Sequence, residues 1–297
     1  MLRSGTYSIV AHDPATGEVG VAVQSHWFSV GAVVPWTRAG VGAVAVQSVP
    51  DPVAGPRLLD RLQAGEAPEA ALAAELAADE QRDFRQTALV AADGRTAVHT
   101  GASCMPDAGH TGGDGFSCQA NIMASERVWP AMAQAFTAAS GPLARRMFAA
   151  LEAAEAAGGD IRGRQSCAIA VAPAVGERWR RTVDLRVEDA PEPLEEMARL
   201  LDVHDAYVLA ARGDDLTSEG RIDEAGAAFR AAAELAPGNH ELLFWAGLAE
   251  FGGGRREEGL ARVRRAVELQ PGWAELLPRL PAAIAPSAAD VAEALGL

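Results

Sequence analysis

The stretch TYSIVAHDPATGEVGVAVQSH, residues 6–26, carries the clearest folding signal in the chain. Two apolar runs rich in β-branched residues, 6–11 and 19–24, flank DPATG, a sequence typical of a tight turn. This order predicts a β-hairpin. The first strand opens on a Gly5–Thr6 junction, so cleavage before Thr6 would place a threonine hydroxyl beside a new α-amine. The competing interpretation is that threonine stands there because β-branched residues favour strands.

Composition limits the kinds of function that the chain can have. It has 297 residues, a hydrophobic fraction of 49% and a formal net charge of −14. This is typical of a globular protein with one large and one smaller domain. The negative charge would repel a phosphate backbone or an anionic lipid surface, so neither nucleic acid nor a membrane is expected as a partner. Three cysteines without a CxxC pair, and no signal-peptide pattern in the first residues, predict a cytoplasmic protein.

Up to about residue 188, β-rich runs alternate with Ala-rich helical stretches. Strand pairs, then two consecutive helices, then strands again favour an α+β domain over a regular βαβ alternation. We place this domain at residues 1–204. Beyond the hairpin, the pattern predicts strands at 41–47, 87–92, 96–100, 116–123, 166–172 and 182–187, and helices at 68–78, 128–138 and 143–157.

From Asp205 onward the sequence is helical and repetitive. GRIDEAGAAFRAAAELAPGN (220–239) is echoed by GRREEGLARVRRAVELQPGW (254–273), an offset of 34 residues that resembles tetratricopeptide repeats. We therefore expect a small all-α helical-repeat domain at 205–297, with 274–297 as its cap. Its concave side is expected to bind a protein partner, either an acidic peptide or a second copy of the chain, which would make a homo-oligomer.

Polar side chains stand at or near the ends of several predicted strands. Ser25 and His26 follow the second strand, where serine can orient a nucleophile and histidine can carry protons; alternatively, both cap a solvent-exposed strand end. Gln47, Gln119 and Asn121 lie in or beside apolar strands. Such amides bind a substrate or an oxyanion, or else satisfy buried backbone groups.

The glycine-flanked segment GGDIRGRQS, residues 158–166, carries Asp160, Arg162 and Arg164. The planar guanidinium suits a carboxylate or phosphate, so these residues are candidates for binding substrate, Arg162 first among them. In the structural alternative, Asp160 and Arg164 pair with each other and hold the turn.

No metal or cofactor is expected. The side chains that could ligate zinc stand at spacings that match no familiar zinc motif: His99, Cys104, His110 and Cys118. Patterns for nucleotide binding or metalloprotease activity are also absent from the sequence.

Three motifs in this order resemble the bacterial and archaeal family known as domain of unknown function 1028. They are the stretch 6–26, HTGASC…GHTGGDGFSCQANIM between residues 99 and 123, and AAGGDIRGRQS at 156–166. The resemblance extends from Thr6 to about Leu201. Members of that family resemble the N-terminal-nucleophile (Ntn) hydrolases, so the resemblance implies a four-layer αββα sandwich with two stacked sheets.

Residues and resemblance together predict an Ntn-type hydrolase that acts on an amide or related bond of a small molecule or peptide. Thr6 is the candidate nucleophile, with Ser25, His26 and Asn121 in support. The candidate substrate-binding residues are Gln47, Gln119, Asp160, Arg162 and Arg164. The alternative is a non-catalytic binding or scaffold protein that keeps the Ntn fold and docks a partner through its repeats.

Overall fold

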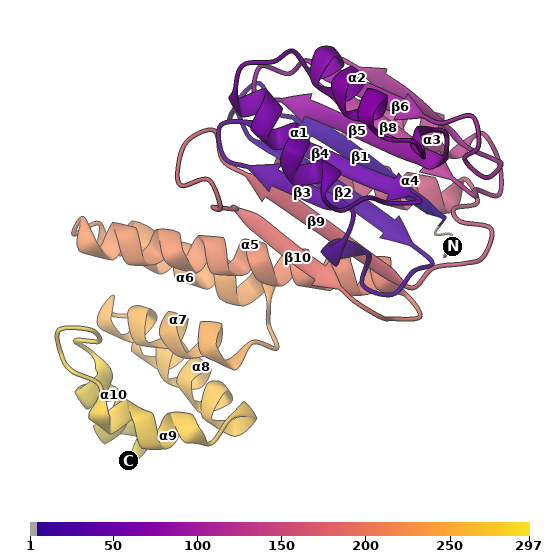
Figure 1. Ribbon diagram of the computed structural model, residues 1–297. Coiled ribbons are helices and arrows are strands. Elements are labelled where there is room, and N and C mark those ends of the chain that lie inside the picture. The colour runs from indigo at the N-terminus through magenta and orange to yellow at the C-terminus, as the bar shows by residue number, and fades with distance from the viewer. Residues whose placement is uncertain (1–4) are drawn as a thin grey trace. The chain divides into compact units, whose positions relative to one another are not determined.

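The computed structural model describes residues 5–297, and the chain forms two compact units, residues 1–198 and 199–297 (Figure 1). Helix α5 (Pro193–Ser218) contains the division between the units. The domain boundary predicted between residues 204 and 205 lies within this same helix.

Two antiparallel sheets form the centre of the first unit, which confirms a mixed α and β fold. In the six-stranded sheet the order is β10-β9-β2-β1-β8-β7, with strands β1 (Thr6–His12), β2 (Val19–Ser25), β7 (Gly109–Gly113), β8 (Phe116–Asn121), β9 (Ser166–Ala172) and β10 (Val183–Val187). In the four-stranded sheet it is β3-β4-β5-β6, with β3 (Pro35–Arg38), β4 (Gly42–Ser48), β5 (Arg85–Ala91) and β6 (Thr96–Thr100).

The predicted hairpin is confirmed, because β1 pairs antiparallel with β2 and places Thr6 opposite Ser25. The sequence pattern missed β3 and β7. Each is an edge strand, and each contains residues that are unfavourable in strand interiors: Pro35 in β3 and several glycines in β7.

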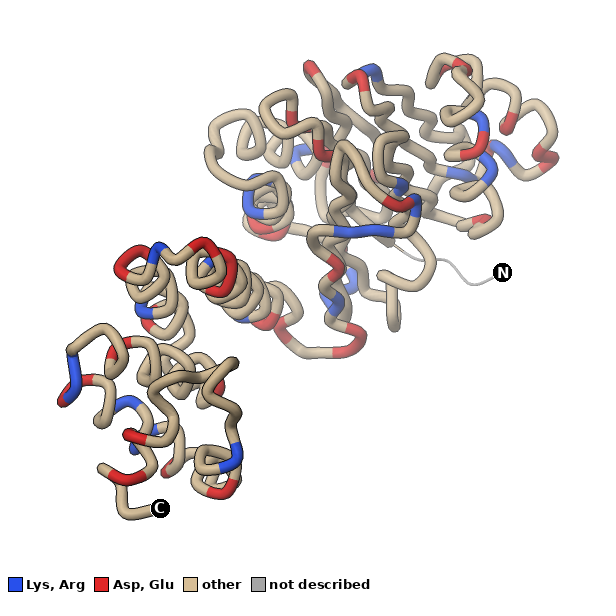
Figure 2. Tube along the Cα trace, turned by 90° about the vertical axis from the view of Figure 1, so that its left-hand side faces the viewer, with Lys and Arg blue, Asp and Glu red and all other residues tan. Residues whose placement is uncertain are grey.

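Helices cover the outer faces of both sheets (Figure 1). Helix α2 (Pro68–Ala78) and helix α1 (Ala54–Gln63), which was not predicted, pack on the four-stranded sheet. Helices α3 (Val128–Ala138) and α4 (Leu143–Ala156) pack on the six-stranded sheet, close to their predicted bounds. Figure 2 shows that charged positions lie mainly on helices, loops and strand ends.

The layer between the two sheets is polar at one end and apolar at the other. Alternation along β1 turns Thr6, Ser8 and Val10 toward the opposite sheet. The apolar zone consists of buried side chains from both sheets: Val10, Val19, Val21, Val23, Val30, Val34, Ala39, Ala43, Ala45, Ala88, Val90, Ala168 and Ala172. The polar zone consists of buried polar side chains: Thr6, Ser8, Ser25, Gln47, Gln86, Ser117, Gln119 and Asn121.

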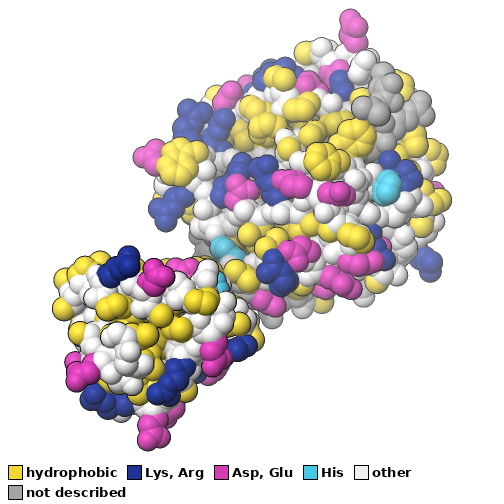
Figure 3. All heavy atoms as spheres, turned by 90° about the horizontal axis from the view of Figure 1, so that it is seen from below, with side chains coloured by type: hydrophobic (Ala, Val, Ile, Leu, Met, Phe, Trp, Pro, Cys, Tyr) yellow, Lys and Arg dark blue, Asp and Glu magenta, His cyan; other side chains and the backbone are white. Residues whose placement is uncertain are grey.

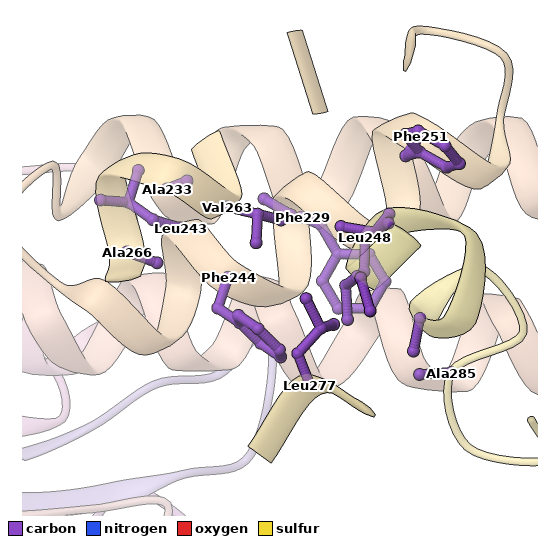
Figure 4. Close-up of a cluster of buried hydrophobic side chains, with 14 of the residues drawn as sticks. Phe229, Ala233, Leu243, Phe244, Leu248, Phe251, Val263, Ala266, Leu277 and Ala285 are labelled. Carbon is purple, nitrogen blue, oxygen red and sulfur yellow. The ribbon is translucent and has the colours of Figure 1, made fainter. Parts of the chain in front are cut away.

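The second unit is helical. It contains most of α5, then α6 (Ile222–Leu235), α7 (His240–Gly252), α8 (Arg256–Leu269), α9 (Gly272–Leu276) and α10 (Ala288–Leu295). Figure 4 shows Phe229, Phe244, Leu248 and Leu277 gathered between these helices, and all four belong to one buried cluster.

Helices α7 and α8 approach closely because small residues face each other. A Cβ atom at Gly247 would lie 2.8 Å from the carbonyl oxygen of Gly259. The side chains of Ala225, Phe229, Ala232 and Ala233 form a buried apolar stripe along α6, whereas Arg264 and Arg265 of α8 are exposed. Figure 3 shows charged side chains of both signs on the visible faces of both units. Within residues 5–297, every helix is too short or too polar to cross a membrane.

Candidate active site

The carbonyl group that precedes Thr6 is held by two hydrogen-bond donors. The Gly5 oxygen accepts a hydrogen bond from the Ser25 hydroxyl, and a second from Nη2 of Arg162 at 3.1 Å. Thr6 Oγ1 in turn donates to Ser25 Oγ at 3.1 Å. The β1–β2 register produces this contact, because it sets Thr6 and Ser25 opposite each other. A chain of hydroxyls therefore leads from Thr6 to the carbonyl oxygen of its own preceding residue.

Asp160 orients the Arg162 guanidinium toward that carbonyl. Asp160 Oδ2 accepts from Arg162 Nη2 at 2.7 Å, and Oδ1 accepts from Arg162 Nε at 3.1 Å. The Asp160 side chain is fully buried, and an isolated β-bridge to Met123 anchors its backbone. The alternative pairing predicted from the sequence, Asp160 with Arg164, does not occur. The tight loop favours the nearer arginine, since Gly159 and Gly163 take positive φ angles of 56° and 101°.

Behind Thr6, the amide side chains of the polar zone form a continuous network. Gln86 Oε1 accepts from Gln47 Nε2 at 2.8 Å and from Asn121 Nδ2 at 2.9 Å. Gln86 Nε2 donates to the carbonyl oxygen of Ala120 at 2.9 Å. Gln86 thus joins the two sheets. The sequence pattern did not select it, although it precedes an apolar run in β5 as Gln47 follows one in β4.

Asn121 stands opposite Thr6 in the β1–β8 register and reaches toward it. Its Nδ2 lies 3.5 Å from the Thr6 carbonyl oxygen. Its Oδ1 is buried and accepts no hydrogen bond from any residue in 5–297. This unsatisfied acceptor lies at the end of the network nearest the candidate nucleophile, where an additional donor would stabilise it.

Gln119 lies deeper in the polar zone than predicted for a substrate contact. Its Nε2 donates to Ser8 Oγ at 2.6 Å, and Ser8 in turn donates to Gln47 Oε1 at 2.6 Å. These contacts bind β1, β8 and β4 together. Gln119 therefore supports the network and does not contact Gly5 or Thr6 through a side-chain hydrogen bond among those described.

Two predicted residues do not join the site through their side chains. His26 is exposed and contributes its backbone N–H to Asp160 Oδ2 at 3.3 Å, so its imidazole is not positioned as the predicted proton carrier. It lies in a bend just beyond the last residue of β2, Ser25, where the strand no longer fixes its direction. Arg164 pairs with Glu155 at 3.4 Å and Glu192 at 3.0 Å, away from the Gly5 carbonyl.

The backbone is strained beside two of the amides. Ser48 and Ile122 follow Gln47 and Asn121, and they adopt φ angles of 72° and 59°. Bulky residues in the left-handed region cost stability, most of all when β-branched as Ile122 is, and they persist where the surrounding contacts hold them. Both strands thus end abruptly just beyond the polar zone.

Two titratable groups near this region have shifted pKa values. Burial raises the pKa of Tyr7 well above its ordinary value. The Glu155 carboxylate raises this pKa further, because its Oε2 accepts a hydrogen bond from the Tyr7 hydroxyl at 2.9 Å. Burial lowers the pKa of His110, whose Nδ1 lies 2.9 Å from Thr100 Oγ1 at the far end of the network.

Metal-binding geometry is not found in the part of the chain that the structure describes: no three His, Cys, Asp or Glu side chains cluster there suitably. Cys104, Cys118 and Cys167 are free thiols. The side chains gathered around the Gly5 carbonyl and Thr6 carry hydroxyl, amide, carboxylate and guanidinium groups.

Comparison with known proteins places the chain in a family. The model of a family described as of unknown function, DUF1028, matches residues 6–197, so the chain belongs to this family. A crystal structure of protein SPO2555 from Silicibacter pomeroyi, matched to the same family model, is similar at 31% sequence identity with a TM-score of 0.61. That similarity covers 66% of this chain and 84% of the other. No curated protein matches the chain.

Proposed function

We propose that this protein is an Ntn-type hydrolase that cleaves its own Gly5–Thr6 bond and then hydrolyses an amide or related bond of a small molecule or peptide. One observation carries the proposal. The carbonyl oxygen before Thr6 accepts hydrogen bonds from both Ser25 and Arg162, while the Thr6 hydroxyl is linked to the same Ser25 oxygen. Two donors on a carbonyl oxygen stabilise the negative charge that develops there during nucleophilic attack.

Self-cleavage follows from this arrangement. Thr6 Oγ1 adds to the Gly5 carbonyl carbon, and its proton moves to Ser25 Oγ as the Ser25 proton moves toward the developing oxyanion. The C–N bond then breaks as this proton passes to the Thr6 nitrogen and the carbonyl re-forms, leaving Gly5 as an ester on Thr6 Oγ1 and giving Thr6 a free α-amine. Water hydrolyses the ester, which releases residues 1–5 with a terminal carboxylate and restores the threonine hydroxyl.

The mature site repeats the same chemistry on a substrate. An α-amine has an ordinary pKa of about 8, so its neutral form can accept the Thr6 hydroxyl proton as that oxygen attacks a substrate carbonyl. Asn121 lies opposite Thr6, and its unsatisfied Oδ1 is a ready acceptor for a new N–H donor nearby. The complete burial of Thr6 is expected before cleavage, because Gly5 still covers its nitrogen.

The fold supports this assignment. Helices α1 and α2 pack on the four-stranded sheet, and helices α3 and α4 pack on the six-stranded sheet. This arrangement supports the proposal of an Ntn-type αββα sandwich. The candidate nucleophile opens a central strand, β1, at the polar end of the layer between the sheets.

Intact mass of the purified protein tests the proposal. We expect the chain to begin at Thr6, Thr6→Ala to remain uncut and inactive on amide substrates, and Thr6→Ser to retain cleavage. Ser8→Ala is the matched control, since Ser8 is a buried hydroxyl on the same face of β1 without a hydrogen bond to Gly5 in the structure. A wild-type chain that keeps residues 2–5 and hydrolyses no amide would contradict the proposal.

A second candidate is a binding or scaffold protein, favoured by a groove within residues 199–297. This groove has a volume of about 690 Å³ and is lined by Phe229, Leu242, Trp245 and Leu248, with Asp214 and Glu241 among its polar residues. In this alternative, the helices form a tetratricopeptide-type module that docks a partner. The two carboxyl side chains disfavour an acidic peptide as that partner.

A further inference from the structure

The geometry points to an acyl-binding position that admits only acyl groups whose α-carbon carries no side chain, so that the substrates are amides of glycine or of unbranched carboxylic acids. This inference rests on the proposed function, in which Thr6 is the nucleophile. It concerns the part of the substrate that remains bound to Thr6 after the leaving amine has departed.

The space around Gly5 carries the inference. A Cβ atom built on Gly5 would lie 2.5 Å from Asp160 Oδ2, 2.7 Å from Arg162 Nη2 and 2.9 Å from Asp160 Cγ. Each distance is shorter than a van der Waals contact. Gly5 has no positive φ angle, so backbone strain would not exclude a larger residue there. The side chains of Asp160 and Arg162 exclude it.

Asp160 has little freedom to move aside. Its Oδ1 accepts from the backbone N–H of Arg162 at 2.9 Å, and its Oδ2 accepts from the backbone N–H of His26 at 3.3 Å. The guanidinium of Arg162 binds both carboxylate oxygens, and the side chain is fully buried. Displacing this carboxylate would break several charge-assisted hydrogen bonds and leave a buried charge poorly solvated.

The same restriction applies to a substrate. In self-cleavage, Gly5 is the acyl group that Thr6 attacks, with its carbonyl oxygen on Ser25 and Arg162. A substrate carbonyl attacked by the same oxygen and held by the same donors occupies the position of the Gly5 carbonyl. Its α-carbon then stands where the Gly5 α-carbon stood, with Asp160 where an L side chain would project.

The reaction is balanced without any additional reactant. Thr6 Oγ1 forms an ester with the acyl carbon, the amide C–N bond breaks, and the leaving amine takes the proton first removed from the hydroxyl. Water then cleaves the ester, giving a carboxylate and the free Thr6 hydroxyl. Asp160 takes no part in the proton transfers; it acts only by position and shape.

Acylation of Thr6 by activated esters tests the inference on the self-cleaved protein, which begins at Thr6 and keeps both units. The probes are the p-nitrophenyl esters of N-acetylglycine and N-acetyl-L-alanine, and the readout is the rate at which the acyl mass appears on the peptide that begins with Thr6. We expect the glycine ester to react about tenfold to a hundredfold faster, the size of effect that overpacking a filled site produces.

Equal rates with both esters would overturn the inference and leave the proposed function intact. Acylation by neither ester would instead overturn Thr6 as the nucleophile, and with it both proposals. Thr6→Ala, which is expected to stay uncut, shows how much acylation occurs elsewhere in the chain.

A second test uses the chain's own acyl group. Gly5→Ala should slow self-cleavage at least about tenfold, while a matched melting temperature shows that the fold is retained. Gly238→Ala is the control, because an added Cβ there meets no atom within 4 Å. Self-cleavage of Gly5→Ala at the wild-type rate would overturn the inference.

Discussion

Along β1 the inward-facing side chains change from Thr6 and Ser8 to Val10, and along β5 they change from Gln86 to Ala88 and Val90. The same strands thus build both the polar zone and the apolar zone of the layer between the sheets. In the apolar zone, burial of each methylene contributes about 0.8 kcal/mol, and packing alone accounts for the residues found there. The polar zone has no such explanation.

A hydrogen bond between buried amides contributes only about 1 kcal/mol net, and a buried polar atom without a partner costs more than that. Asn121 Oδ1 is such an atom, and the residue after Asn121 has a strained backbone. The polar zone therefore gives up stability that valines and alanines would supply. The comparison teaches that the polar zone holds Gly5 and Thr6 in place through hydrogen bonds, whereas the apolar zone contributes stability through packing.

The largest effect should come from Arg162. We expect Arg162→Gln to slow self-cleavage about a hundredfold, because it removes one of two donors from the Gly5 oxygen. Arg162→Lys keeps the charge and should recover part of the rate, which separates loss of the donor from loss of folding. The measurement is the time course of the intact mass. Wild-type kinetics in Arg162→Gln would show that Arg162 does not activate this carbonyl.

The next largest effect, on the free energy of unfolding, should come from placing an apolar side chain in the polar zone and a polar one in the apolar zone. Gln86→Leu is expected to lower the free energy of unfolding by about 2–3 kcal/mol, because Gln47, Asn121 and a backbone carbonyl lose their partner. Val90→Thr is the matched change in the apolar zone, and its buried hydroxyl should cost about 1–3 kcal/mol. Urea denaturation measures both. If Gln86→Leu were as stable as the wild type, the amide network would not hold the sheets together.

An effect that is smaller per pH unit is expected at high pH, on the outer face of the six-stranded sheet. Burial, with a minor contribution from Glu196, raises the pKa of Cys167 from 9.0 to about 12. The native state therefore favours the thiol, and its contribution is complete below about pH 9 and falls as pH rises toward about 12. The slope is at most about 1.4 kcal/mol per pH unit. Cys167→Ala should flatten this part of the stability profile, measured by urea denaturation; an unchanged slope would contradict the expectation.

The smallest effect should come from Arg164, two positions from Arg162. Its ion pairs with Glu155 and Glu192 are partly exposed, so Arg164→Gln should change stability by less than about 1 kcal/mol. Self-cleavage should proceed at the wild-type rate. A loss of cleavage comparable to that of Arg162→Gln would place Arg164 in the site after all.

Much of the local structure follows from the sequence alone. The hairpin of β1 and β2, the helices α2, α3 and α4, and the buried stripe of α6 all follow from hydrophobic periodicity and turn residues, which depend on near neighbours in the chain. The same alternation singled out Gln47 and Asn121 as polar positions in apolar strands. It missed β3 and β7, because edge strands tolerate proline and glycine and so lack the usual signal.

Only the tertiary structure decided which of the polar residues meet. Arg162 and Gly5 are 157 positions apart, and no periodicity relates them. The pairing of Asp160 with Arg162, the outward side chain of His26 and the joining role of Gln86 depend on how the loop at 158–163 and the two sheets come together. Local patterns specify which way a side chain points from its strand; stacking the sheets specifies what it touches.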